Sequence, residues 1–188
     1  VLLWHGGHAA DAYISGGEQV VHDALAANCR VAVLDMPLHG ANAGIPARTT
    51  DGRVVDPQRP DPYSLHNDLS WLDPDNTGAA LSLFIAPVVA TVDHFLNADP
   101  ASDITLAGFS GGGWTTTVAA AVDPRIRHSV EVAGSQPFSD LSSCTGDYEQ
   151  CHPALFGRVS MMQIYVLASQ GLFREHVQFL NFHDTCCY

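Results

Sequence analysis

Residues 104–114 read Ile-Thr-Leu-Ala-Gly-Phe-Ser-Gly-Gly-Gly-Trp, and this stretch decides the fold. A strand-like apolar run leads into Gly-Phe-Ser-Gly-Gly at 108–112, and a helix-like, Ala-rich run follows. A turn this tight has no room for side chains beside the serine, which explains the flanking glycines. The serine is then held in a strained conformation that exposes its hydroxyl. The pattern G-x-S-x-G between a strand and a helix predicts a nucleophile elbow centred on Ser110.

A plain glycine-rich turn is the alternative interpretation of this stretch. Such a turn could also bind phosphate, but a P-loop requires a lysine after its glycine. The chain contains no lysine, and all eight of its basic residues are arginine. The catalytic interpretation of Ser110 is therefore the stronger one.

The overall composition indicates one globular domain over residues 1–188. Hydrophobic residues make up 46% of the chain and charged residues 15%, which excludes a disordered chain. The net charge of −12 argues against nucleic acid and anionic membrane surfaces as partners. No run of about 18 uninterrupted apolar residues is present, so we expect no membrane span.

The chain opens on Val-Leu-Leu-Trp, an apolar run without a signal-peptide pattern. Because chain termini usually lie at the surface, we expect Val1 to be an internal cut rather than a natural start. The cellular compartment therefore stays unassigned between cytoplasmic and secreted, and the sequence gives no oligomeric state.

Five cysteines are present, and their odd number argues against a complete disulfide framework. Cys144 and Cys151 could pair across a short loop, whereas a bridge between the adjacent Cys186 and Cys187 would be strained. We expect free or partly paired cysteines. The CxxC spacing of zinc sites is missing, and we expect neither a metal nor an organic cofactor.

Strand-like and helix-like runs alternate along the chain. Strands are expected over 1–4, 30–35, 103–107, 128–133 and 176–182, and helices over 18–28, 78–98, 112–122 and 153–171. This alternation predicts an α/β fold with a mostly parallel sheet and helices on both faces. Residues 41–77 are too long for an ordinary connection, so they are either functional or a decoration.

A serine nucleophile needs hydrogen-bond donors for the oxyanion that forms during acyl transfer. One donor should be the backbone N–H of Gly111, at the start of the following helix. The second should come from the loop after an earlier strand, which here reads His-Gly-Gly-His at 5–8. We favour Gly7 for this role and then His8, although an ordinary strand end is the alternative.

A serine nucleophile also needs a base and an acid that orients it. Ligands of open α/β sheets bind beyond the carboxyl ends of the strands, and Asp184 follows the last expected strand. Asp140 is a weaker candidate for the acid. Asp35 also ends a strand, but it precedes the nucleophile, so we expect it to cap its loop.

The chain resembles the α/β-hydrolase superfamily, and its esterase or acyl-hydrolase branches in particular. His-Gly-Gly at 5–7 resembles the oxyanion loop, 108–112 the nucleophile elbow, and Phe-His-Asp at 182–184 the acid after a strand. The resemblance spans what would be the third to the seventh strand. It implies an α/β-hydrolase-like fold with a small cap insertion at 135–171.

In this superfamily a histidine follows the acid along the chain, but none follows Asp184. One explanation is a fragment that lacks the N-terminal strands and the C-terminal histidine segment. A second is a histidine at an unusual position; the candidates are His8, His39, His152 and His183. His183 neighbours Asp184, but neighbours along a strand point to opposite faces. The third is a non-catalytic relative.

The function predicted from these residues is hydrolysis of a small-molecule carboxylic ester through an acyl-enzyme on Ser110. An amidase, a peptidase or an acyltransferase on the same scaffold is one alternative, because a fold alone does not decide its reaction. A non-catalytic binding protein is the other.

Overall fold

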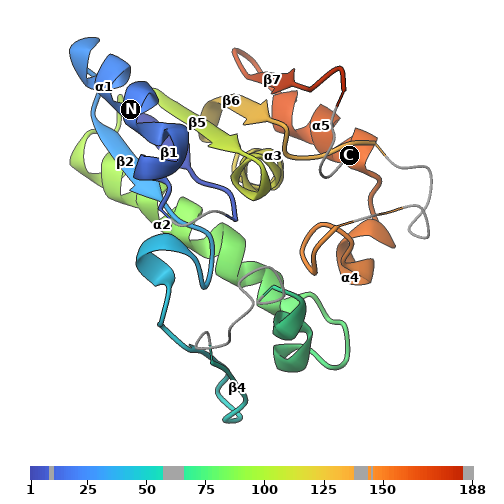
Figure 1. Ribbon diagram of the computed structural model, residues 1–188. Helices are drawn as coiled ribbons and strands as arrows, with labels where there is room; N and C mark the ends of the chain where they lie inside the picture. Colours follow the sequence, from blue (N-terminus) through green and yellow to red (C-terminus); the bar gives the residue numbers. More distant parts are fainter. Residues whose placement is uncertain (9–10, 57–65, 138–143, 145, 184–188) are drawn as a thin grey trace.

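The computed structural model describes residues 1–8, 11–56, 66–137, 144 and 146–183. Within them, five parallel strands form the central sheet in the order β2-β1-β5-β6-β7 (Figure 1). Their bounds are β1 Leu2–His5, β2 Val31–Leu34, β5 Ile104–Phe109, β6 Ile126–Val132 and β7 Glu175–Phe179. The protein is of the α/β class, as the alternating pattern predicts.

The order of the strands reverses between β1 and β5. After β1 the chain moves outward to β2 on one side, and after β5 it moves outward to β6 and β7 on the other. The loops that follow β1 and β5 therefore leave the shared edge of the sheet in opposite directions. Such a switch point is where open α/β sheets form their ligand crevice.

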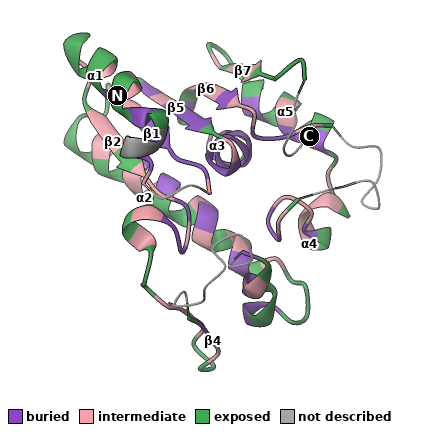
Figure 2. Ribbon diagram, in the orientation of Figure 1, coloured by how far each residue is buried: buried purple, intermediate pink, exposed green. Residues whose placement is uncertain are grey.

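Helices lie on both faces of the sheet. One apolar cluster joins the sheet to α2 (Ser82–Ala98), α3 (Gly111–Val122) and α5 (Met161–Ser169). The opposite face carries α1 (Glu18–Ala26), next to Trp4 and Ala107. Consecutive residues of a strand face opposite ways, which explains why Leu3 and Trp4 belong to different clusters. Figure 2 shows α3 buried along most of its length.

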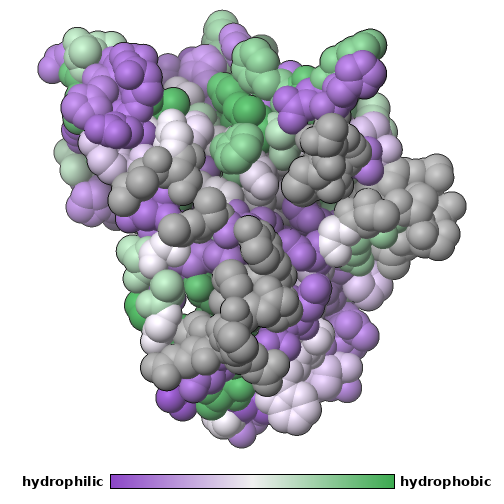
Figure 3. Space-filling view, in the orientation of Figure 1, coloured by the Kyte–Doolittle hydropathy of each residue, from purple (hydrophilic) through white to green (hydrophobic). Residues whose placement is uncertain are grey.

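The main contacts of α1 with the sheet are with β1 and β2, away from β7. The strand β7 at the other edge carries exposed apolar side chains, which are Val177 at 41% and Phe179 at 58% exposure. Figure 3 shows apolar surface at the top of the molecule, in the region of β6 and β7. The α1 side of the sheet is thus only partly covered by described residues.

A third apolar cluster lies beyond the carboxyl edge of the sheet. It joins Met36, Leu69 and Tyr148 to Phe84 of α2 and Trp114 of α3. Its shorter elements are β3 (Ala47–Arg48), β4 (Val54–Val55), the 3₁₀ helix η4 (Asn67–Leu72) and α4 (Pro153–Phe156). The long segment after β2 and the segment after β6 therefore pack against each other beside the carboxyl ends of the strands.

Two expected elements differ from the observed ones. The stretch 153–171, expected to be one helix, forms the two helices α4 and α5. A capping box begins α5: the Ser160 hydroxyl accepts from the backbone N–H of Gln163, and the Gln163 side chain accepts from the backbone N–H of Ser160. The strand expected over 176–182 ends at Phe179. Phe182 beyond it is 95% exposed, and its ring contacts the neighbouring His183 at 4.6 Å between ring centroids, not the sheet core.

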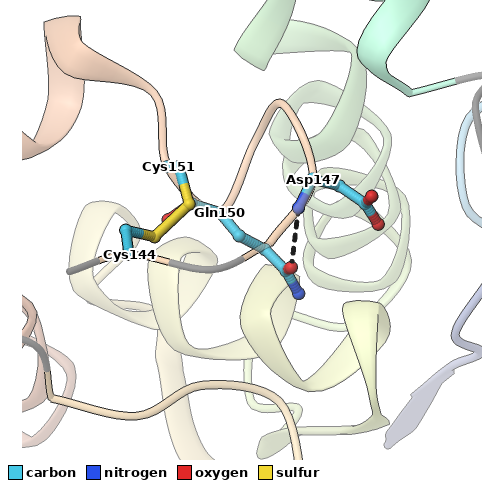
Figure 4. Close-up of a disulfide and its surroundings, with 4 residues drawn as sticks. All are labelled: Cys144, Asp147, Gln150 and Cys151. Carbon is cyan, nitrogen blue, oxygen red and sulfur yellow. Dashed lines mark hydrogen bonds between the residues drawn. A yellow bond between two sulfur atoms is a disulfide. The ribbon is translucent and has the colours of Figure 1, made fainter. Parts of the chain in front are cut away.

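A disulfide joins Cys144 to Cys151, with the two Cα atoms 5.8 Å apart (Figure 4). Within the loop that it closes, the backbone N–H of Asp147 donates to the side-chain oxygen of Gln150 at 3.1 Å. Cys29 is free, so the expectation of partly paired cysteines is confirmed for the described residues. Cys186 and Cys187 lie outside them.

One helical stretch, Ala79–Ala98, is long and apolar enough to cross a membrane by length and composition, with a mean hydropathy of 1.8. A single stretch of this kind is weak evidence, since core helices of soluble proteins share these properties. Phe84, Val88 and Val92 on this helix pack in the core. The absence of a membrane span stays a prediction.

The sheet core should account for much of the stability. Leu106 of β5 is completely buried, and Leu106→Ala should lower the free energy of unfolding by about 2–5 kcal/mol. The matched control is Leu172→Ala, at a leucine that is 88% exposed, where the change should stay within about 0.5 kcal/mol. Urea unfolding measures both, and equal losses would contradict this assignment of the core.

Candidate active site

Ser110 occupies the strained turn that the sequence predicts. Its backbone has φ 56° and ψ −126°, a conformation that residues with side chains rarely adopt and that costs about 1–3 kcal/mol. Three backbone hydrogen bonds hold it there: its N–H donates to the carbonyl of Val132 at 2.8 Å, and its carbonyl accepts from the N–H groups of Gly113 at 2.8 Å and Trp114 at 3.1 Å. The turn is therefore fixed from both β6 and α3.

The glycines around Ser110 are required by close backbone contacts. A Cβ atom on Gly108 would lie 2.2 Å from the carbonyl oxygen of Gly112. A Cβ atom on Gly112 would lie 2.3 Å from the carbonyl oxygen of His5, at the end of β1. The steric reason predicted for the G-x-S-x-G pattern is confirmed at these positions.

Gly7 lies directly against the serine. A Cβ atom on Gly7 would be 2.8 Å from Ser110 Cβ and 3.3 Å from Ser110 Oγ. The pairing of His5 with Gly108 in the sheet brings the two loops to the same level. Gly111 is the first residue of α3, whose N-terminal dipole favours negative charge. The structure thus brings together the predicted site residues Gly7, Ser110 and Gly111.

His8 also lies at this site. A Cβ atom on Gly111 would be 2.4 Å from His8 Cε1 and 2.7 Å from His8 Nδ1, so the imidazole ring covers this glycine. The Nε2 atom of the ring contacts the carboxylates of Asp147 and Glu149 instead, each at 3.1 Å. The side chain of His8 is therefore engaged by acids, while its backbone role in an oxyanion hole stays a prediction.

The predicted acids divide into two groups. Asp184 and Asp140 lie outside the described residues, so their roles stay predictions. Asp35 caps its loop as expected, because its carboxylate accepts from the N–H groups of Ala12 at 2.7 Å and Ala41 at 2.9 Å.

Within the described part of the chain, no histidine hydrogen-bonds to the Ser110 hydroxyl. His39 is buried, and its ring packs edge-on against the ring of His8. His152 caps α4 through Nδ1, which accepts from Ala154 N–H at 3.1 Å. His183 is exposed. Of the four candidate histidines, which all lie in the described part of the chain, only His8 contacts the turn at Ser110.

Four side chains converge beside the elbow and form what we call the His–carboxylate cluster: His8, His66, Asp147 and Glu149. One potential ligand atom from each lies within 4.8 Å of every other. His66 precedes η4 in the long segment after β2, whereas Asp147 and Glu149 lie in the disulfide loop. The sequence analysis missed this grouping, because nothing in the spacing links a loop histidine at 66 to acids some eighty residues later.

The charges of this cluster depend on one another. Burial alone would raise the pKa of Glu149, but hydrogen bonds from His66 and His8 outweigh it and hold that pKa at about 2. Burial and the charge of Glu149 raise the pKa of Asp147. Burial and the two neighbouring histidines lower the pKa of His39 to about 4, so His39 is neutral at physiological pH.

A second polar network ties the same two segments together. The carboxylate of Asp73 accepts from the hydroxyl of Tyr148 at 3.1 Å and lies 3.2 Å from His152 Nε2. It also accepts from the backbone N–H groups of Thr77 at 2.9 Å and Gly78 at 2.7 Å. Burial would raise the pKa of Asp73, but the hydrogen bond from the Thr77 hydroxyl at 2.6 Å, together with those above, prevails and holds it at about 2.

Neither a protein-family model nor a curated protein matches this sequence. The assignment of a function therefore depends on the geometry described above.

The network at Asp73 predicts a specific dependence of stability on pH. Because its pKa is held below the ordinary 3.8, the carboxylate stabilises the fold above about pH 4, and this contribution disappears as the pH falls toward 2. Asp73→Asn should lower the free energy of unfolding at pH 7 by about 2 kcal/mol, and this difference should vanish near pH 2.

Urea unfolding at several pH values measures this difference. The matched control is Asp75→Asn, two residues further on at an exposed position, where the change should stay within about 0.5 kcal/mol at every pH. A deficit in Asp73→Asn that is the same at low and neutral pH would exclude the proposed role of the charge.

Proposed function

We propose that this protein is a serine hydrolase that cleaves small-molecule carboxylic esters. The observation that carries the proposal is the strained Ser110 at the switch point of the sheet, with Gly7 pressed against it. A serine held at positive φ without a structural need for its side chain is typical of a nucleophile elbow. The hydroxyl oxygen attacks the ester carbonyl and passes its proton to a base. The alcohol leaves, and water then releases the acid from the acyl-serine.

The oxyanion formed in this step requires two donors at the elbow. We assign them to the backbone N–H of Gly111 and the backbone N–H of Gly7, with that of His8 as the runner-up. Two features support this assignment. Gly111 begins a helix of 12 residues, and Gly7 has no side chain between its backbone and Ser110.

The resemblance to the α/β-hydrolase superfamily supplies the remaining roles. It assigns the acid to Asp184 and the base to a histidine oriented by it. The parallel sheet supports this resemblance, and so does the meeting of the loops after β1 and β5. These roles belong to the proposal, as does the α/β-hydrolase-like fold itself.

A cap over the site is part of the same proposal. Within the expected cap at 135–171, α5 packs on α3 against the sheet. The part around Asp147 and Glu149 instead reaches His8 beside the elbow. We therefore assign the covering role to the disulfide loop and α4, and assign α5 to the sheet layers.

Labelling by a fluorophosphonate tests the proposal, because this probe reacts with activated serines. The protein produced from its complete gene should be labelled at Ser110 and should hydrolyse p-nitrophenyl acetate. Ser110→Ala should abolish labelling and lower turnover by about 10³-fold or more. The matched control is Ser82→Ala, at the start of α2, which should behave as wild type.

Three results would redirect or overturn the proposal. Turnover in Ser110→Ala equal to that of wild type would overturn it. Absence of both labelling and turnover in the folded protein would favour the non-catalytic alternative. Labelling with turnover of amides or acyl transfer, but not of esters, would select the first alternative reaction.

The role of Gly7 can be tested separately. Gly7→Ala places a methyl group 2.8 Å from Ser110 Cβ and 2.9 Å from the carbonyl oxygen of Phe109. The loop must then move away from the serine, so kcat for the ester should fall by about 10²-fold or more. Steady-state kinetics measures the change, and circular dichroism verifies the fold. An unchanged kcat would remove Gly7 from the oxyanion hole.

A further inference from the structure

The His–carboxylate cluster joins three segments that are distant in the sequence. His8 follows β1, His66 precedes η4, and the two carboxylates lie between the disulfide-bonded cysteines. Its central distances are short: His8 Nε2 lies 2.8 Å from His66 Nδ1 and 3.1 Å from Glu149 Oε1. His66 Nδ1 lies 3.2 Å from the same carboxylate oxygen. Four potential ligands thus point at one small volume.

The tautomer of His66 is fixed from outside the cluster. Its Nε2 lies 2.8 Å from the carbonyl oxygen of Pro37, and a carbonyl oxygen can only accept, so Nε2 carries the proton. When His66 is neutral, Nδ1 therefore directs a lone pair into the cluster, and when it is an imidazolium, Nδ1 donates to Glu149 Oε1 instead. An imidazole that donates its outer N–H to a backbone carbonyl and offers its other nitrogen inward is the usual arrangement of a metal ligand.

Protons alone do not satisfy this cluster. If both ring nitrogens that face the centre carry a proton, two N–H groups oppose each other across the 2.8 Å between His8 and His66. If only one of these two nitrogens carries a proton, its single N–H faces three acceptors: the two carboxylates and the lone pair of the other ring. Glu149 is fully buried, and its Oε2 atom accepts no hydrogen bond although it lies 3.2 Å from His66 Nδ1. A buried carboxylate oxygen without a hydrogen bond destabilises the folded protein.

We propose that the His–carboxylate cluster is a binding site for a divalent cation of the zinc type. The ligands are His8 Nε2, His66 Nδ1 and one oxygen each from Asp147 and Glu149. Tetrahedral zinc holds nitrogen and oxygen ligands at about 2.0–2.2 Å, which places neighbouring ligands about 3.3 Å apart. The contacting atoms are 2.8 to 3.2 Å apart, within about half an ångström of this spacing. All four ligand atoms lie within 4.8 Å of one another, so the pairs that are not in contact close by up to about 1.5 Å when the ion binds.

The chemistry of the ligands selects the class of cation. Two imidazole nitrogens suit zinc and its transition-metal neighbours, whereas calcium and magnesium prefer shells of oxygen alone. The two carboxylates balance the charge of a divalent ion inside the buried site. Asp147, whose side chain is 29% exposed, provides the side through which the ion exchanges with solvent.

The bound ion fixes the position of the loop that follows β1. It ties His8, whose ring covers Gly111, to the long segment after β2 and to the disulfide loop. This role concerns the protein's own loops, so the site does not depend on the proposed esterase activity.

Direct metal binding tests the site. The chelator-treated protein is titrated with zinc chloride in competition with a chromogenic chelator, and with calcium and magnesium chloride for comparison. We expect one zinc per chain and no competition from calcium or magnesium. His66→Ala and Glu149→Gln should each weaken zinc binding by more than about 100-fold. The matched controls are His22→Ala and Glu18→Gln, an exposed histidine–glutamate pair 3.9 Å apart, which should bind zinc as wild type does.

A second measurement needs no variant that could fail to fold. X-ray absorption of the zinc-loaded wild type should show only nitrogen and oxygen neighbours. Sulfur neighbours, or a folded wild type that binds no zinc, would overturn the proposal. Zinc binding that is unchanged in both His66→Ala and Glu149→Gln would also overturn it.

Ser110→Ala should bind zinc with the affinity of the wild type. This variant separates the two proposals: loss of the metal site and loss of the nucleophile give independent results.

Discussion

The close approach of two loops across the switch point is the constraint on which the rest of the structure depends. The end of β1 and the turn after β5 lie so near each other that a side chain at Gly112 would strike the backbone carbonyls of His5 and Gly6. A side chain at Gly7 would strike Ser110 itself. Ser110 lies at this contact with a positive φ of 56°. The strain is offset by the parallel sheet and by the burial of α3, which anchor both sides of the turn.

Polar networks hold the loops that surround this contact. Asp35 fixes the loops after β1 and β2, Asp73 joins the long segment after β2 to the segment after β6, and the His–carboxylate cluster joins both segments to His8. Buried charges of this kind are costly unless every partner is in place, so they stabilise one arrangement of the loops in preference to others. The rigidity of the site thus comes from the loops as well as from the sheet.

The sequence predicts what local chemistry and periodicity determine. Continuous apolar runs such as 30–35 and the glycines of 108–112 specify strands and a tight turn by themselves, so the α/β class and the strained turn at Ser110 could be predicted. The contacts among His8, His66 and Glu149 depend on how two long irregular segments fold back on the sheet. No periodicity encodes that path, and the absence of CxxC spacing pointed away from a metal. The end of the last strand was also placed too late, because Phe182 is apolar but almost fully exposed, with its ring against the neighbouring His183.

We propose that Ser110 is a nucleophile whose oxyanion is held by backbone N–H groups of two loops. A crystal structure of the protein after reaction with a phosphonate ester tests it most directly. The account predicts a covalent bond from phosphorus to Ser110 Oγ and a phosphoryl oxygen within about 2.7–3.1 Å of the backbone nitrogens of Gly111 and Gly7. An adduct on another residue, or a phosphoryl oxygen turned away from both nitrogens, would contradict it.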